Sequence, residues 1–259
     1  MTEIVAEEIT VRADGVSVVP RKEFCRRFPY KAGQHVVFGG PSGRGKTELA
    51  FDLLETTATP ALPAYVAVSK PTDPVTAKRG RQLGFRFVRD WPAPPKVKEL
   101  WDGKPSGYVI WPPFGDINRD MVRAAGITAE LIEDRYSASA RGDKHAAGIL
   151  MMDDTMVKAK VMGLDRHMVT MLAMAKAMKI GLWVFVQKPT DSGRTTLWAY
   201  ENGDHFFLTK GGDTRMLKRY EEIAGENGPV VRAVIPTLKN FQFLYFEKDH
   251  GYMCIVDAK

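Results

Sequence analysis

Residues 36–47 read Val36-Val-Phe-Gly-Gly40-Pro-Ser-Gly-Arg-Gly45-Lys46-Thr47, and the apolar, helix-like residues 48–54 follow directly. This stretch matches the pattern Gly-x-x-x-x-Gly-Lys-[Ser/Thr], placed between a predicted strand and a predicted helix. Glycines at these positions let backbone N–H groups turn inward around phosphate oxygens, and the start of the helix adds positive potential. The sequence therefore predicts a phosphate-binding loop. A glycine-rich turn without a nucleotide is the alternative interpretation.

The residue types in this loop predict a division of roles. Lys46 would reach the β- and γ-phosphates of a nucleotide, and Thr47 would offer its hydroxyl to Mg²⁺. The phosphates would also be surrounded by the six preceding residues, which are Gly40, Pro41, Ser42, Gly43, Arg44 and Gly45.

Two further apolar runs end in polar residues. Residues 148–152 precede the acid pair Asp153 and Asp154, and residues 181–186 precede Gln187. Beside a bound triphosphate, Asp153 would hold Mg²⁺ through water, and Asp154 would polarise the water that attacks the γ-phosphate. A buried strand with a polar tip would place the amide of Gln187 beside the same phosphate. Two solvated acids at a strand end are the alternative interpretation of the pair.

The remaining pattern predicts the fold class. Short apolar runs alternate with longer amphipathic segments, which is typical of an α/β fold with a central, mostly parallel sheet. The expected strands are residues 35–38, 64–69, 107–111, 148–152, 181–186 and 205–208. The expected helices are residues 45–55, 116–125, 128–136 and 164–178.

Both ends of the chain depart from this alternation. Residues 1–34 alternate in short β-like pieces and predict an N-terminal β extension. Residues 229–259 predict a C-terminal β-hairpin extension, with strands at 241–246 and 252–256. The core would then span residues 35–228. Residues 91–113, rich in proline and tryptophan, are expected to form an irregular connection over the sheet.

Composition narrows the classes of function. Cys25 and Cys254 are the only cysteines among 259 residues, so neither a disulfide scaffold nor a zinc site is expected. The net charge of +6 mildly favours a polyanionic partner. Lys176 and Lys179 interrupt the most apolar stretch, residues 168–186, so no transmembrane segment is expected. The acidic first residues lack a secretory signal pattern, which predicts a cytoplasmic protein.

The order of these features resembles the FtsK/HerA superfamily of DNA-pumping ATPases and, within it, the small viral and phage genome-packaging ATPases. The resemblance spans residues 34–225 and rests on the phosphate loop, the strand before the acid pair and the strand that ends at Gln187. Residues 65–74 also resemble the second strand and turn of relatives, and residues 205–215 resemble their last core strand and loop. The resemblance implies a P-loop fold with an extra strand between the strands that carry the loop and the acid pair.

Roles follow by position from this resemblance. Asp153 would hold the metal, Asp154 would be the base and Gln187 would be the sensor. Asp154 departs from the Glu of most relatives, so its carboxylate lies about one methylene further from the water. Where relatives have an arginine before the Gln strand, this chain has Lys176, which lacks the planar guanidinium fork. Arg215 would be an arginine near the γ-phosphate of the same or a neighbouring subunit. The candidates for a finger supplied to a neighbouring subunit are Arg215, Lys176, Arg166 and Arg194.

The resemblance also implies the activity and the partners. Identical subunits, five or six in a ring, would hydrolyse ATP with Mg²⁺ and translocate double-stranded DNA, packaging a viral genome in the host cytoplasm at a portal or capsid vertex. DNA would be contacted at its phosphates, independently of sequence. The polar, basic loops at 137–145 and 189–196 offer DNA-contact candidates, with solvated loops as the alternative; these candidates are Arg141, Lys144 and Arg194.

Other functions stay open on the sequence. A plasmid-transfer or chromosome-segregation translocase is the alternative within the motor class. A P-loop kinase acting on a small acceptor and a nucleotide-gated assembly protein without sustained turnover are the alternatives from other classes.

Overall fold

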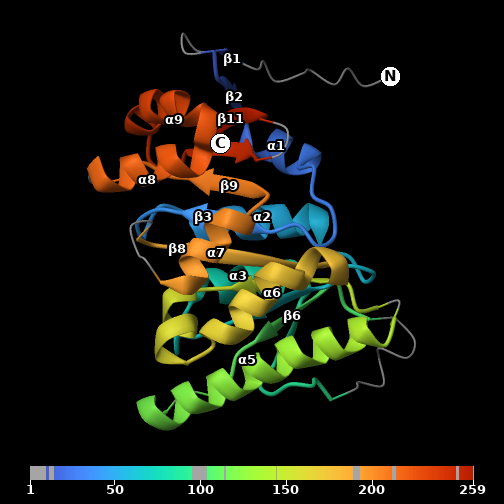
Figure 1. The fold of residues 1–259 in the computed structure, drawn as a ribbon. Helices are drawn as coiled ribbons and strands as arrows, with labels where there is room; N and C mark the ends of the chain where they lie inside the picture. Colours follow the sequence, from blue (N-terminus) through green and yellow to red (C-terminus); the bar gives the residue numbers. More distant parts are fainter. Residues whose placement is uncertain are drawn as a thin grey trace, which may run out of the picture.

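A computed structural model describes residues 10–11, 15–94, 104–113, 115–143, 145–188, 193–211, 214–248 and 251–258. Within these residues, one 11-stranded sheet has the order β1-β2-β11-β10-β9-β3-β8-β7-β4-β6-β5 (Figure 1). The strands are β1 (Thr10–Val11), β2 (Ser17–Val19), β3 (Val36–Gly39), β4 (Ala64–Ala67), β5 (Arg86–Val88), β6 (Gly107–Ile110), β7 (Gly148–Met152), β8 (Ile180–Val186), β9 (His205–Leu208), β10 (Phe243–Glu247) and β11 (Met253–Val256).

Within the series β9-β3-β8-β7-β4-β6-β5, every pair of neighbouring strands is parallel. Antiparallel pairs occur only toward the other side of the described sheet, where β10 pairs with β9 and β11 and β1 pairs with β2. β8 lies between β3, which leads into the glycine-rich loop, and β7, which leads into the acid pair. The predicted α/β class and the extra strand between these two strands are confirmed.

Helices cover both faces of the sheet (Figure 1). One face carries α1 (Arg21–Arg27), α2 (Lys46–Thr57) and α3 (Pro74–Gln82). The other face carries α5 (Ile117–Ala140), α6 (Asp165–Met178), α7 (Arg194–Asn202), α8 (Thr214–Ala224) and α9 (Gly228–Val234). A π-helix, η1 (Val157–Val161), precedes α6, and short 3₁₀ helices, η2 (Gly225–Asn227) and η3 (Ile235–Thr237), flank α9. In the part of the chain that the structure describes, no helix has the length and apolar character needed to cross a bilayer.

The continuous apolar runs of the sequence arise because the strands are buried on both faces. Successive side chains of a strand point to opposite faces. In β3, Val36 and Phe38 pack in the cluster beneath α1 and α2, whereas Val37 packs in the cluster beneath α5 to α9. A run without polar alternation therefore marks a central strand here.

Two predictions of secondary structure are corrected by the structure. Residues 116–125 and 128–136 are predicted as separate helices but form one 24-residue helix, α5. Gly126 lies inside it at a cost of about 1 kcal/mol relative to alanine, which the burial of neighbouring Ile127 and Leu131 offsets. Residues 21–27 lie in the predicted N-terminal β extension but form α1, because Pro20 precedes a turn that buries Phe24.

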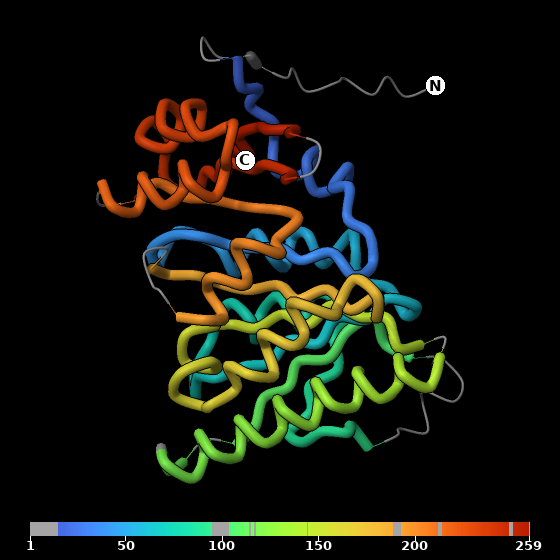
Figure 2. Tube along the Cα trace, viewed as in Figure 1, coloured from blue at the N-terminus to red at the C-terminus, as the bar shows by residue number. Residues whose placement is uncertain are grey.

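The C-terminal hairpin is confirmed, since β10 and β11 pair antiparallel with Phe243 opposite Val256. It continues the central sheet, because β10 also pairs with β9. Residues 229–234 of the predicted C-terminal extension belong to α9, which begins at Gly228, the last residue of the predicted core. The Cα trace shows the N-terminal and C-terminal segments lying side by side, where β2 pairs with β11 (Figure 2).

An aromatic cluster joins these terminal elements to the strand that leads into the loop. Phe207 of β9 stacks on Phe38 of β3 at 5.3 Å between ring centroids. The same ring lies 5.7 Å from Phe24 of α1 and 5.0 Å from Tyr245 of β10. Phe207 is wholly buried, so its ring connects three elements that are distant in the sequence.

We expect Phe207→Ala to lower the free energy of unfolding by about 3–5 kcal/mol, because a buried ring is lost and a cavity remains. Urea denaturation followed by circular dichroism measures this change. Val122→Ala on α5 is the control: Val122 is 74% exposed, so its effect should stay within about 0.5 kcal/mol. Equal effects of the two variants would contradict the role given to the aromatic cluster.

Candidate functional site

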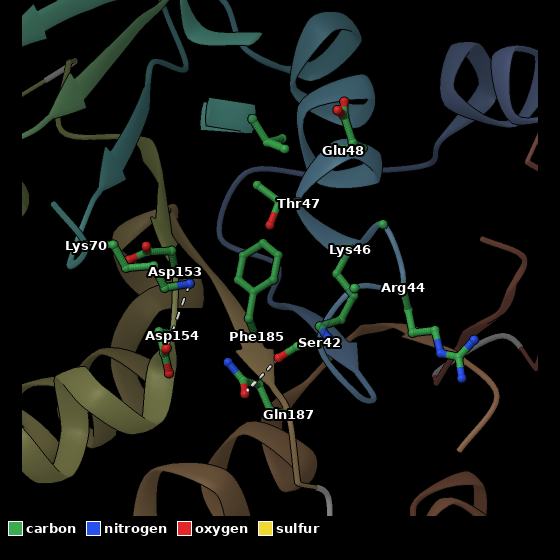
Figure 3. A pocket seen from close by; sticks show the side chains of 13 residues that line it. Ser42, Arg44, Lys46, Thr47, Glu48, Lys70, Asp153, Asp154, Phe185 and Gln187 are labelled. Carbon is green, nitrogen blue, oxygen red and sulfur yellow. Dashed lines mark hydrogen bonds and ion pairs between the residues drawn. The ribbon is translucent and has the colours of Figure 1, made fainter. Parts of the chain in front are cut away.

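The carboxyl ends of β3, β7 and β8 meet around a cavity of about 230 Å³ (Figure 3). Parallel strands end at the same edge of a sheet, so residues that follow neighbouring strands come together there. The cavity is lined by Ser42, Gly43, Arg44, Gly45, Lys46, Thr47, Glu48, Lys70, Val75, Asp153, Asp154, Phe185 and Gln187. The loop, the acid pair and the glutamine predicted from three separate stretches of sequence therefore lie at one place.

The loop between β3 and α2 depends on its glycines. Gly40, Gly43 and Gly45 have φ values of 132°, 76° and 78°, which L side chains rarely adopt. A Cβ atom on Gly40 would also lie 2.0 Å from Oγ1 of Thr209. The backbone can therefore follow this path only with glycine at these positions.

Lys46 is buried at the first turn of α2, and its Nζ donates hydrogen bonds of 2.6 Å to the carbonyl oxygens of Gly40 and Pro41. Burial and, to a smaller extent, the charge of Lys70 lower the pKa of Lys46 to about 8, whereas Asp154 acts in the opposite direction. A bound polyanion would offset the effects of burial and of Lys70. The electrostatics of the cavity therefore favour a negatively charged ligand beside Lys46.

Asp153 follows β7 and is 4% exposed. Its Oδ1 accepts hydrogen bonds from Oγ of Ser69 at 3.0 Å and from Nζ of Lys158 at 2.8 Å. Lys158 is fully buried on the π-helix η1, so this ion pair is shielded from water. These contacts hold the carboxylate in place, and Oδ2 accepts a longer hydrogen bond of 3.5 Å from the backbone N–H of Ser69.

Asp154 has a left-handed backbone, with φ of 42°. This conformation is uncommon for residues other than glycine, although Asp adopts it more readily than most. Its Oδ2 lies 3.8 Å from Nζ of Lys70, which follows β4 (Figure 3). Asp154 is thus held at the mouth of the cavity beside a cation.

Gln187, at the tip of β8, contacts the loop directly. Its Oε1 accepts a hydrogen bond of 3.1 Å from Oγ of Ser42 (Figure 3). The backbone N–H of Gly40 donates to the carbonyl of Val186 at 2.9 Å. A movement of Ser42 in the loop would therefore displace Gln187, which is bonded to Ser42 and directly follows β8.

The residues present fit the predicted magnesium ion. Thr47 and Asp153 both line the cavity and supply a hydroxyl and a carboxylate oxygen. Mg²⁺ prefers oxygen ligands and is usually bound by one or two protein groups together with water and substrate phosphates. The donor set matches that preference.

Three finger candidates lie at the same edge of the sheet as the cavity. Arg166, Arg194 and Arg215 occupy the first turns of α6, α7 and α8, which begin beyond the carboxyl ends of the strands. All three side chains are exposed, and none is among the described residues that line the cavity. Their positions leave them accessible to a neighbouring molecule.

Lys176 lies elsewhere. α6 returns toward the edge where the strands begin, and Nζ of Lys176 pairs there with Asp204 at 2.5 Å. Asp204 in turn accepts a hydrogen bond from the backbone of His35, directly before β3. Lys176 is therefore not among the described residues that line its own subunit's cavity, and its role as a finger toward a neighbouring subunit stays a prediction.

The two described DNA-contact candidates lie at opposite edges of the sheet. Arg141 is exposed at the end of α5, near the edge where β7 begins. Arg194 starts α7 at the opposite edge. Lys144 lies outside the described residues.

The sequence analysis missed Ser69, Lys70 and Lys158. Ser69 and Lys70 follow β4, which pairs in parallel with β7. Predicting that these two strands are neighbours would have indicated that Ser69 and Lys70 lie beside Asp153. Lys158 is five residues after Asp153, in a segment where charged residues usually face solvent. Its burial follows from the packing of η1, which no spacing rule predicts.

No protein-family model matches the chain, and no curated protein sequence matches it. Solved structures do resemble its fold. The genome packaging NTPase B204 from Sulfolobus turreted icosahedral virus 2, in complex with AMPPCP, aligns with a TM-score of 0.58 at 12% identity, over 88% of this chain and 99% of that chain. VirB4 of Thermoanaerobacter pseudethanolicus aligns with a TM-score of 0.60 at 10% identity, over 87% of this chain and 89% of that chain.

The cytoplasmic domain of the type VII secretion ATPase EccC of Thermomonospora curvata aligns with a TM-score of 0.51 at 12% identity, over 96% of this chain and 28% of that chain. At these identities the likeness shows the fold alone, and this α/β fold is the one that the resemblance stated above implies.

Lys46→Ala should weaken the binding of a nucleoside triphosphate by about 100-fold or more, because truncating one partner of a buried charged contact costs several kcal/mol. Isothermal titration with ATP and Mg²⁺ measures the affinity. Lys78→Ala, at an exposed lysine of α3, is the control and should bind like the wild type. An unchanged affinity of Lys46→Ala would remove the basis for the phosphate site.

Lys158→Met should lower the free energy of unfolding by about 3–5 kcal/mol, because it leaves a buried carboxylate without its cation. Urea denaturation measures the change, with Lys160→Met, at an exposed lysine of the same π-helix, as the matched control. Adding Asp153→Asn to Lys158→Met should recover part of the loss. A loss no larger than that of the control would show that the pair does not hold Asp153 in place.

Proposed function

We propose that this chain is a magnesium-dependent ATPase whose identical subunits form a ring that translocates double-stranded DNA, packaging a viral genome. The observation that carries the proposal is the convergence of five side chains on one cavity from three strand ends. These side chains are Lys46, Thr47, Asp153, Asp154 and Gln187. Phosphoryl transfer from ATP to water requires groups that bind the phosphates, hold the metal and orient the water, and these five side chains are of the types that do so.

In this proposal the loop and Lys46 hold the β- and γ-phosphates of ATP. Thr47 and Asp153 are the residues that would hold Mg²⁺. The ion, when bound, neutralises charge on the phosphates and on the leaving group. Ser69 and Lys158 keep the carboxylate of Asp153 fixed, so no reorganisation is needed as charge develops.

Asp154 would orient the attacking water and accept its proton, because its carboxylate lies at the mouth of the cavity. Lys70, whose Nζ lies 3.8 Å from Oδ2 of Asp154, holds that carboxylate beside the site. Gln187 would detect the terminal phosphate, since it is hydrogen-bonded to Ser42 of the loop. Loss of the γ-phosphate would then be transmitted through Ser42 and Gln187 to β8.

A finger from the neighbouring subunit would complete the site. Arg166, Arg194 and Arg215 support this role, because all three are exposed at the same edge as the cavity. A guanidinium group stabilises the charge of a transferring phosphoryl group, and its supply in trans would link hydrolysis in one subunit to the position of the next. We favour Arg215, at the start of α8, on the resemblance described above.

The proposed partners follow from the same class of motor. The net charge of +6 suits a DNA backbone, and Arg194 lies in an exposed position on the nucleotide side of the sheet. Subunits would assemble as a pentamer or hexamer in the host cytoplasm and dock at a portal or capsid vertex. The likeness in fold to B204, which is described as a genome packaging NTPase, supports a packaging role.

Steady-state ATP hydrolysis, measured with and without long duplex DNA, tests this function. We expect Mg²⁺-dependent turnover that rises with DNA and loses the stimulation as salt is raised, because contacts to phosphates release counterions. Asp154→Asn should keep ATP binding but lower kcat by about 100-fold or more.

Three outcomes would contradict the proposal. Turnover that needs a small acceptor would indicate a kinase. Full activity of Asp154→Asn would indicate a protein gated by nucleotide binding alone. Turnover indifferent to DNA at every salt concentration would exclude a DNA motor.

A further inference from the structure

A turn near the C-terminus lies against the phosphate-binding loop. The guanidinium group of Arg44 donates a hydrogen bond to Oδ1 of Asn240, 196 residues later in the chain. The ring of Phe241 packs on Gly45, where an added Cβ atom would lie 3.0 Å from Cδ1 of the ring. The loop and this turn are therefore in direct contact on the side of Arg44.

The turn is held from two directions. The side chain of Arg21 donates a hydrogen bond of 2.8 Å to the carbonyl of Phe241 and lies 3.5 Å from Asp52 of α2, the helix that follows the loop. On the other side, Oε1 of Gln242 accepts from the backbone of Lys239 at 2.9 Å. The position of the turn is thus tied to both the loop helix and the backbone before β10.

Phe241 is unusual in two respects that its packing does not explain. Its backbone is left-handed, with φ of 65°, a conformation that costs free energy for a bulky residue. Its side chain is 50% exposed, so the chain gains only part of the free energy that burying a phenyl ring provides. A strained and exposed aromatic residue beside a ligand loop points to a role in binding.

The geometry of the cavity indicates where a nucleoside would lie. Asp153, Asp154 and Gln187 lie on one side of Lys46, and Arg44 lies on the other (Figure 3). A triphosphate whose terminal phosphate faces Asp154 and Gln187 runs along the loop, so its nucleoside leaves on the opposite side. That is the side on which Arg44 meets Asn240 and Gly45 meets Phe241.

We propose that Phe241 is the base-stacking residue of the site, and that its ring receives the base of a nucleotide whose phosphates occupy the loop. The inference rests on the proposed function, which supplies the nucleotide. Base–aromatic stacking tolerates every base, since each has a π-face. Phe241 therefore contributes affinity for a nucleoside over a bare polyphosphate.

Two probes separate the base from the phosphates: ATP and inorganic tripolyphosphate, each titrated with Mg²⁺ by calorimetry. Phe241→Gly removes the ring and suits the positive φ, so this variant folds without strain. It should lose about 5- to 100-fold in affinity for ATP, the range expected for one lost stacking contact. Its affinity for tripolyphosphate should equal that of the wild type.

Two further variants serve as controls. Phe241→Trp keeps an aromatic face and should retain the affinity for ATP. Tyr252→Ala removes a comparably exposed ring, 48% exposed, just before β11 and outside the contacts described above. It should bind both probes like the wild type.

Equal losses for both probes in Phe241→Gly would overturn the proposal, because they would mean that the ring only shapes the loop through Gly45. Unchanged affinity for ATP would overturn it as well and would leave the proposed ATPase intact. Failure of the wild-type protein to bind either probe would contradict the proposed function itself, and stacking with it.

Discussion

The position of β8 between β3 and β7 is the constraint on which the site depends. Backbone pairing sets Gly39 opposite Val186 and Met152 opposite Val184, so the three strands end within a few residues of one another. The loop, Asp153 and Gln187 are the next residues along these strands. Because hydrogen bonds fix this register, the cavity does not depend on the conformation of long side chains to bring its parts together.

Charge then decides what the cavity accepts. Lys46, Lys70 and Lys158 lie around two carboxylates, and two of these lysines are buried. Lys158 compensates the buried charge of Asp153, while burial and Lys70 lower the pKa of Lys46. A bound polyphosphate would supply the missing negative charge beside Lys46, and its divalent cation could be coordinated by the carboxylate oxygens of Asp153. A metal–triphosphate complex, the ligand of the proposed function, would meet both requirements.

The sequence predicted those parts of the fold and of the site that depend on residues adjacent in the chain. The glycine pattern of the loop, the apolar runs of the central strands and the polar residues at the ends of β7 and β8 each carry their own signal. Two secondary-structure predictions were wrong because tertiary burial outweighs local preference. Residues 21–27 form a helix that buries Phe24, and α5 continues through Gly126 because its inner face is buried. Lys158 and Phe241 could not be predicted, since tertiary contacts alone place them, and the direction of α6 puts Lys176 at the far edge.

The convergence of three strand ends on one triphosphate is tested most directly by a structure of the protein with Mg²⁺ and a non-hydrolysable ATP analogue. We predict that the β- and γ-phosphates contact Lys46 and the loop, that the metal lies between Thr47 and Asp153, and that Asp154 and Gln187 face the terminal phosphate. An analogue bound at another cavity, or a terminal phosphate directed away from Asp154 and Gln187, would contradict the account.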